Sequence, residues 1–149
     1  PFLEEKAAAL GIPHGPERRD LVQGSTIKLP SGVLVQPDEV LGPVEPGTKL
    51  VHVGDTGRTD DLLEHCRDAD ALVVEATYLQ PEADLARRFG HLTAQQAAEL
   101  AAAANVRRLY LTHLSRRYRE RDVLAEARAV FSDTVVARDL DHFQVKREK

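Results

Sequence analysis

The stretch that decides the fold is residues 49–61, KLVHVGDTGRTDD. Its apolar run, residues 50–53, predicts a buried strand, and Gly54 allows the sharp exit that follows. The polar segment after Thr56 is typical of the start of a helix. The strand therefore delivers the carboxylate of Asp55 to its C-terminal end, and in open α/β sheets this is the edge where ligands bind.

Two later strands are predicted to end at the same edge. Residues 71–76 (ALVVEA) lead into Thr77, and residues 108–112 (RLYLT) lead directly into His113. A third polar group, His91, lies just before Thr93, where residues 93–96 (TAQQ) have the pattern of a helix-starting capping box. We therefore expect Asp55, His91 and His113 to be the residues that carry chemistry.

Length and composition narrow the class of protein. The chain has 149 residues, 42% of them hydrophobic and 30% charged, which is ordinary for one soluble globular domain. No apolar run is long enough to span a membrane, and no leader opens the chain, so we expect a cytoplasmic protein with no membrane partner. The single cysteine, Cys66, is predicted to be a packing residue in a reducing compartment. A net charge of −4 argues against an indiscriminate nucleic-acid binder.

The order of patterns along the chain predicts an α/β fold. Residues 1–48 are predicted to hold a helix (2–10), a loop (14–24), a hairpin (26–29 with 33–36) and a connector (37–46). Residues 49–149 are predicted to be an α/β core, with further strands at 71–76, 108–112 and 134–137 and a terminal stretch at 142–146. Its helices are predicted at 60–66, 81–89, 93–104 and 120–131. Short apolar strands separated by helices indicate a parallel sheet covered on at least one face.

The chemistry of these side chains admits two interpretations. The Asp55 carboxylate and the His113 imidazole suit zinc or a similar divalent ion; alternatively, Asp55 caps the following helix and His113 is a turn histidine. His91 ahead of a helix N-terminus suits a group that hydrogen-bonds or passes on a proton, or it is an ordinary loop histidine. Glu75 ends an apolar strand, so it lies either in water at the sheet edge or buried against a partner such as His91.

The segment after His113 offers groups for phosphate. The Ser115 hydroxyl and the Arg117 guanidinium suit a phosphate ligand, although most such charged runs are simply solvated loops. The remaining histidines have no convergent neighbours in the predicted fold, and we assign no role to His14, His52, His65 and His142.

Taken together, the motifs resemble the C-terminal half of the ribonuclease Z family, the tRNA 3′-end endonucleases of the metallo-β-lactamase superfamily. The matching pieces are GDT at 54–56, EAT at 75–77, GHLTA at 90–94 and THLSRRY at 112–118, preceded by GIPHGP at 11–16 and DEVLGP at 38–43. The resemblance covers nearly the whole chain and implies half of an αββα sandwich. GDT alone is a weak signal, whereas the four motifs in this order are specific.

The resemblance also implies roles. Asp55 would bridge two zinc ions, His113 would bind one of them, His91 would act in catalysis, and Glu75 would hold His91. Ser115 and Arg117 would lie near RNA phosphates. The implied reaction is metal-dependent hydrolysis that removes the 3′ trailer from precursor tRNA, in an enzyme that is commonly homodimeric.

Two departures from the family pattern limit this interpretation. Val74 stands where the family often has a histidine, and the family's His-x-His-x-Asp-His motif is absent from the 149 residues. Asp55 and His113 alone cannot complete one zinc site, let alone two. We therefore expect activity only with the N-terminal half as partner. Two alternatives stay open, a metallo-β-lactamase-fold phosphodiesterase acting on a small molecule and a non-catalytic α/β binding module.

Overall fold

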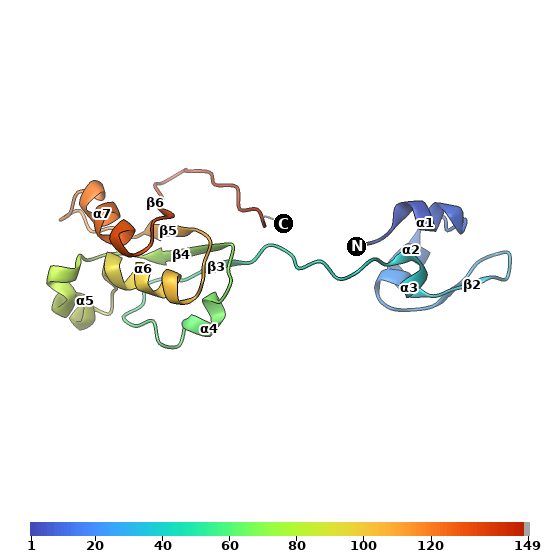
Figure 1. The fold of residues 1–149 in the computed structure, drawn as a ribbon, viewed down its shortest axis with the longest axis horizontal. Coiled ribbons are helices and arrows are strands. Elements are labelled where there is room, and N and C mark those ends of the chain that lie inside the picture. The colour runs from blue at the N-terminus through green and yellow to red at the C-terminus, as the bar shows by residue number, and fades with distance from the viewer. Residues whose placement is uncertain (148–149) are drawn as a thin grey trace. The chain divides into compact units, whose positions relative to one another are not determined.

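The computed structural model describes residues 1–147, and the chain folds into two compact units. The first unit is Pro1–Pro46 and the second begins at Gly47 (Figure 1). Each unit has its own buried core.

The first unit is a small helical layer with one hairpin. It contains α1 (Glu4–Ala9), α2 (Pro16–Val22), β1 (Ile27–Lys28), β2 (Leu34–Val35) and α3 (Pro37–Val40). The predicted first helix and the antiparallel hairpin are confirmed. Side chains from all three helices and both strands form its core, among them Ala7, Leu21, Ile27, Val35 and Val40.

Two predictions for this unit are wrong. The segment 14–24, predicted to be a loop, contains α2, because Pro16 takes a favourable first helical position and Leu21 is fully buried. The segment 37–46, predicted to be a connector, begins with α3, where the Gln36 backbone N–H donates to the Glu39 carboxylate at 2.6 Å. In both places, the proline stands at the start of a helix, where it is tolerated, rather than inside a loop.

The second unit is built on a four-stranded parallel sheet. Its strands are β3 (Leu50–His52), β4 (Ala71–Glu75), β5 (Leu109–Thr112) and β6 (Thr134–Val136), hydrogen-bonded in that order. The α-helices between the strands are α4 (Leu63–Cys66), α5 (Ala83–Phe89), α6 (Ala94–Ala103) and α7 (Glu120–Val130). A short 3-10 helix, η1 (Gln80–Glu82), directly precedes α5. The predicted α/β class and parallel sheet are confirmed.

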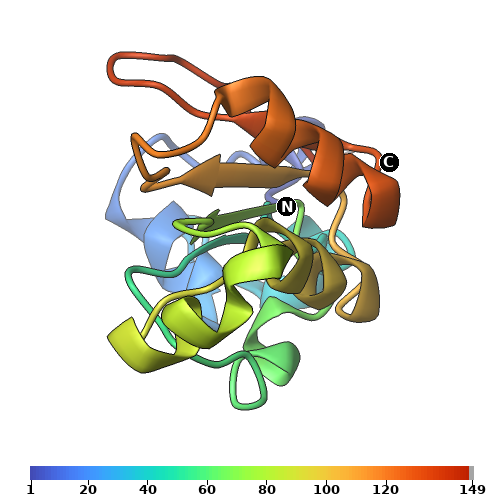
Figure 2. The ribbon, with the colours of Figure 1, turned by 90° about the vertical axis from the view of Figure 1, so that its left-hand side faces the viewer.

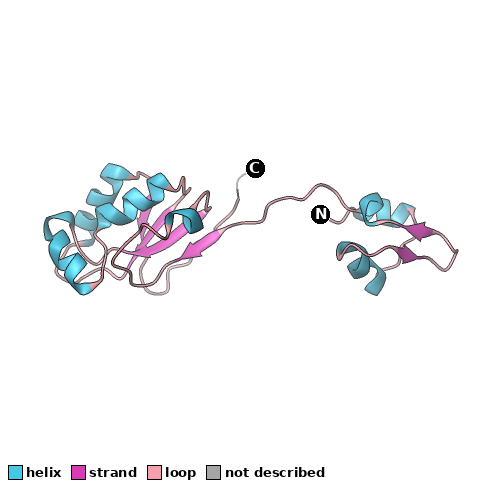
Figure 3. Ribbon diagram, turned by 90° about the horizontal axis from the view of Figure 1, so that it is seen from below, coloured by secondary structure: helices cyan, strands magenta, loops and turns pink. Residues whose placement is uncertain are grey.

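The helices cover one face of this sheet (Figure 3). Helices α6 and α7 pack against each other, and α6 also packs on β4 and β5 (Figures 1 and 2). Leu72, Val74, Leu109 and Leu111 point into this core, and the alanines of α6 allow the helix to approach them closely. Cys66 is fully buried in the same cluster, as predicted for a packing residue.

The opposite face of the sheet is more sparsely covered. Leu50 in β3 is 56% exposed, so the prediction that this strand is buried is wrong. The reason is its position, since β3 is an edge strand of the described sheet and only the Val51 side packs on the core. On this face Tyr110 is covered by Phe143, with ring centroids 4.7 Å apart. The unit thus corresponds to one sheet with its helical layer, as expected for half of a sandwich.

Candidate metal centre

The side chains of Asp55, His91 and His113 converge at the C-terminal edge of the sheet. Asp55 follows β3, His113 follows β5 directly, and His91 lies between α5 and α6. One potential ligand atom from each residue lies within 4.8 Å of the other two. Asp55 Oδ2 is 3.6 Å from His113 Nε2, and the two imidazole centroids are 5.4 Å apart. The predicted convergence is therefore confirmed, while the individual roles stay predictions.

The parallel pairing of the strands, the turn at Gly90 and the close approach of Gly57 to Gly90 explain why these three side chains converge. Because β3, β4 and β5 are parallel neighbours, the segments that leave their C-terminal ends share one edge. Gly90 ends α5 in the left-handed conformation at φ +73°, and the His91 N–H then donates to the carbonyl of Ala86 at 2.9 Å. A Cβ on Gly57 would lie 2.9 Å from the α-carbon of Gly90, so the segments carrying Asp55 and His91 touch through their backbones.

Glu75 is the buried residue that ties the site together. Its side chain is 1% exposed. Of the two alternatives that the sequence leaves open for Glu75, burial against a partner is therefore confirmed, and exposure to water at the sheet edge is wrong. It accepts hydrogen bonds from Thr56 N at 3.0 Å and Thr77 N at 3.2 Å. Its carboxylate also lies 2.9 Å from His91 Nδ1 and 2.5 Å from the Thr77 hydroxyl. One carboxylate thus fixes the segment next to Asp55, the ring of His91 and the end of β4.

This arrangement has consequences for both histidines. With Nδ1 of His91 directed at Glu75, Nε2 is the nitrogen left for a ligand or a proton acceptor. The Thr77 hydroxyl also lies 2.9 Å from the main-chain oxygen of His113, whose backbone has a left-handed φ of 53°. Thr77 therefore links Glu75 to the backbone of His113. Sequence reasoning identifies Thr77 only as part of a motif and misses this contact.

The donor set fits a divalent metal ion. One carboxylate and two imidazoles are ligand types that zinc accepts, and the exposed fractions of Asp55 (60%) and His113 (52%) leave the site open on one side. Among residues 1–147, this is the one group of three or more such side chains with a metal-binding spacing. Two ions would need ligands beyond these three.

Ser115 and Arg117 lie in the segment after His113, where both contact other protein groups. The Ser115 hydroxyl accepts a hydrogen bond from Arg117 N at 3.3 Å. The Arg117 guanidinium pairs with Glu82 at 2.5 Å, and the Tyr118 hydroxyl donates to the same carboxylate. Sequence reasoning misses Glu82 because it lies 35 positions before Arg117 and has no local motif.

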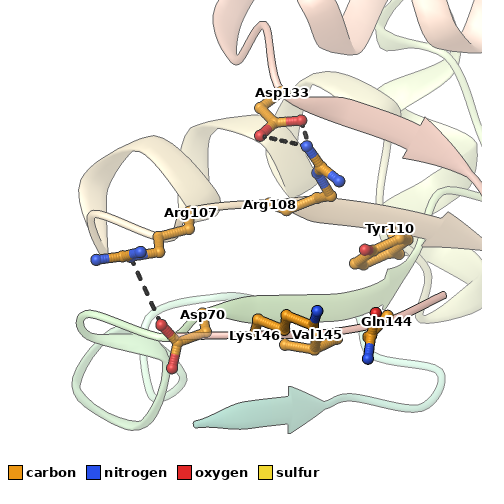
Figure 4. A pocket seen from close by; sticks show the side chains of 8 residues that line it. All are labelled: Asp70, Arg107, Arg108, Tyr110, Asp133, Gln144, Val145 and Lys146. Atoms are coloured by element: carbon orange, nitrogen blue, oxygen red, sulfur yellow. Dashed lines mark hydrogen bonds and ion pairs between the residues drawn. The ribbon is translucent and has the colours of Figure 1, made fainter. Parts of the chain in front are cut away.

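A separate cavity of about 510 Å³ opens at the opposite end of the sheet (Figure 4). Four of its charged side chains form two pairs, since Arg108 makes two hydrogen bonds to Asp133 and Arg107 lies 3.5 Å from Asp70. The hydrogen bonds to Asp133 raise the pKa of Arg108 above its ordinary value. These pairs start β4, β5 and β6 rather than end them, so the cavity is remote from Asp55.

Comparison with known proteins agrees with the fold. Residues 8–114 match the family model of the beta-lactamase superfamily domain, and the chain therefore belongs to this superfamily. Within it, the chain is similar to proteins named Ribonuclease Z. It is 47% identical to that of Bradyrhizobium diazoefficiens over 97% of this chain and 48% of the relative. It is 40% identical to that of Brevibacillus brevis over 99% of this chain and 49% of the relative.

Solved structures show the same likeness. The chain superposes on human tRNase Z, short form, with a TM-score of 0.54 and 28% identity, over 76% of this chain and 37% of that one. It superposes on the metallo-beta-lactamase fold protein YhfI from Bacillus subtilis with a TM-score of 0.56 and 26% identity, over 59% of this chain and 36% of that one. The chain spans about half the length of the curated relatives it matches. In the part of the chain that the structure describes, no helix has the length and apolar character needed to cross a bilayer.

Proposed function

We propose that this chain is the C-terminal half of a metal-dependent endoribonuclease that removes the 3′ trailer from precursor tRNA. The observation that carries the proposal is the convergence of Asp55, His91 and His113 at one sheet edge, with Glu75 buried behind them. The similarity to proteins named Ribonuclease Z, over nearly the whole of this chain, supports the choice of substrate. A non-catalytic binding module would not need a fully buried carboxylate aimed at an imidazole that faces an open site.

Asp55 and His113 are the residues that would hold the metal, whereas His91, the third member of the group, would act on the substrate. The proposed ion is zinc, two per complete site, and the further ligands would come from the N-terminal half. When bound, such a pair of ions stabilises the attacking and leaving oxygens of an in-line displacement at phosphorus. The exposure of both side chains leaves room for the ions and for a phosphate group.

His91 would move a proton at the leaving oxygen. Its Nε2 is free of the contact that Nδ1 makes with Glu75, and this contact holds the ring in one orientation. Ser115 and Arg117 would bind RNA phosphates next to the scissile one, with Arg117 exchanging its contact with Glu82 for the substrate. A homodimeric assembly and a cytoplasmic location belong to the same proposal.

A substrate comparison tests this function. The full-length protein, prepared with zinc, should cleave a precursor tRNA at the end of the acceptor stem far faster than it hydrolyses bis(p-nitrophenyl) phosphate. Rapid hydrolysis of the small diester with no cleavage of precursor tRNA would favour the small-molecule phosphodiesterase. Cleavage of neither substrate by metal-loaded protein would favour the non-catalytic module.

A further inference from the structure

The carboxylate of Glu126 joins two helix starts that lie beside the candidate site. Glu126 is on α7, whereas its partners are the backbone N–H groups of Gln80 and Gln95. Gln80 N lies 3.0 Å from both carboxylate oxygens, and Gln95 N lies 3.0 Å from Oε1. Gln80 begins η1 and Gln95 is in the first turn of α6, so both N–H groups lack acceptors within their own helices.

The two segments joined by Glu126 also hold the backbone next to His91. Tyr78 N donates to the carbonyl of Leu92 at 3.1 Å, and Ala94 N donates to the carbonyl of Tyr78 at 2.9 Å. The Thr93 hydroxyl, which caps α6, donates to the Gln80 side chain at 2.9 Å. Residues 78–80 and 92–95 therefore run side by side, with His91 at one end of this ladder and Glu126 at the other.

We propose that Glu126 is a positioning residue for His91, which acts by clamping the starts of η1 and α6 together. A carboxylate that accepts from N–H groups at two helix N-termini is also favoured by the dipoles of these segments. Without it, the paired segments next to His91 would lose the contact that fixes their far end, and His91 would be held only by its ring contact with Glu75 and by local backbone hydrogen bonds. This inference rests on the proposed function of His91, but its first test does not depend on activity.

The first test measures local opening in the full-length protein. Glu126→Ala should accelerate hydrogen–deuterium exchange in peptides spanning residues 78–82 and 92–97 by about tenfold or more, because both N–H groups lose their acceptor. Glu99→Ala is the matched control, since this exposed carboxylate contacts the side chain of Gln95 at 2.7 Å but not its backbone. Equal exchange in the Glu126→Ala and Glu99→Ala proteins would overturn the proposal.

The second test separates positioning from general stability by a double-mutant cycle. Glu126→Ala should lower kcat for precursor tRNA by about 10- to 100-fold, with KM and metal content unchanged, because a displaced catalytic group costs rate rather than binding. In the His91→Ala background the same substitution should change kcat by less than about twofold. An equal loss in both backgrounds would refute action through His91.

The proposal about Glu126 can still be tested if the alanine variant does not fold or if the unmodified protein does not cleave precursor tRNA. If Glu126→Ala fails to fold, Glu126→Met keeps the length of the side chain while removing both acceptor oxygens, and the same two results are expected of it. If the unmodified protein does not cleave precursor tRNA, the proposed function fails, whereas the exchange comparison still decides whether Glu126 clamps the two segments.

Discussion

Replacing Glu75 with glutamine tests the buried centre of the site most sharply. The amide oxygen can take the place of Oε1 and keep its contacts with Thr56 N and His91 Nδ1. The amide NH₂ then takes the place of Oε2, where it faces the N–H of Thr77 at 3.2 Å and the Thr77 hydroxyl at 2.5 Å. The hydroxyl can turn to accept a hydrogen bond, but the backbone N–H cannot, so one partly buried donor loses its acceptor.

The expected loss follows from these contacts. An unsatisfied buried N–H costs about 1–3 kcal/mol, and the loss of charge assistance in the remaining bonds costs about 1 kcal/mol more. A neutral amide is easier to bury than a carboxylate, which offsets part of this loss. We therefore expect Glu75→Gln to lower the free energy of unfolding by about 2 kcal/mol.

Urea unfolding of the full-length protein, followed by far-UV circular dichroism, measures this change. Glu64→Gln is the control, because Glu64 pairs with Arg67 on an exposed surface and should change the midpoint little. A Glu75→Gln protein within about 0.5 kcal/mol of the unmodified protein would refute the account of Glu75 as a buried acceptor for three segments.

Three further predictions concern other parts of the second unit. Burial raises the pKa of the Cys66 thiol, so at pH 8 it should react with iodoacetamide only after unfolding in urea; rapid labelling of folded protein would contradict its burial. The hydrogen bond from Arg138 lowers the pKa of Glu120, so this pair stabilises the fold above the unfolded pKa and its contribution is lost as pH falls through the lowered value. Glu120→Gln should therefore lower Tm slightly at pH 7 and by less at pH 3, and a Tm difference that grew in acid would contradict this sign. Arg117→Ala should weaken binding of precursor tRNA and reduce the slope of log Kd against log salt by about one, measured by filter binding; unchanged affinity would exclude a phosphate contact.

The elements that depend on local pattern can be predicted from the sequence. The apolar runs before Asp55 and His113 are enough to place both side chains at the same sheet edge, because parallel strands have a fixed direction. The capping box predicted at Thr93 is also confirmed, since the Thr93 hydroxyl accepts from Gln96 N and the Gln96 side chain accepts from Thr93 N. These signals act over a few residues and need no knowledge of the tertiary fold.

The contacts that complete the site depend on segments distant in the sequence. The partners of Glu75 are Thr56, Thr77 and His91, and the sequence suggests only His91. Glu126 reaches helix starts 46 and 31 positions earlier, so no local motif could reveal it. The exposure of Leu50 likewise follows from the place of β3 at the sheet edge rather than from its apolar composition.

The metal content of two variants of the full-length protein tests the division of roles most directly. After dialysis against zinc and removal of free ions, Asp55→Ala should have lost bound metal, because its carboxylate is one of the two side chains proposed to hold the ions. His91→Ala should bind as much metal as the unmodified protein while cleaving precursor tRNA far more slowly. A full complement of zinc in Asp55→Ala, or loss of zinc in His91→Ala, would contradict the account.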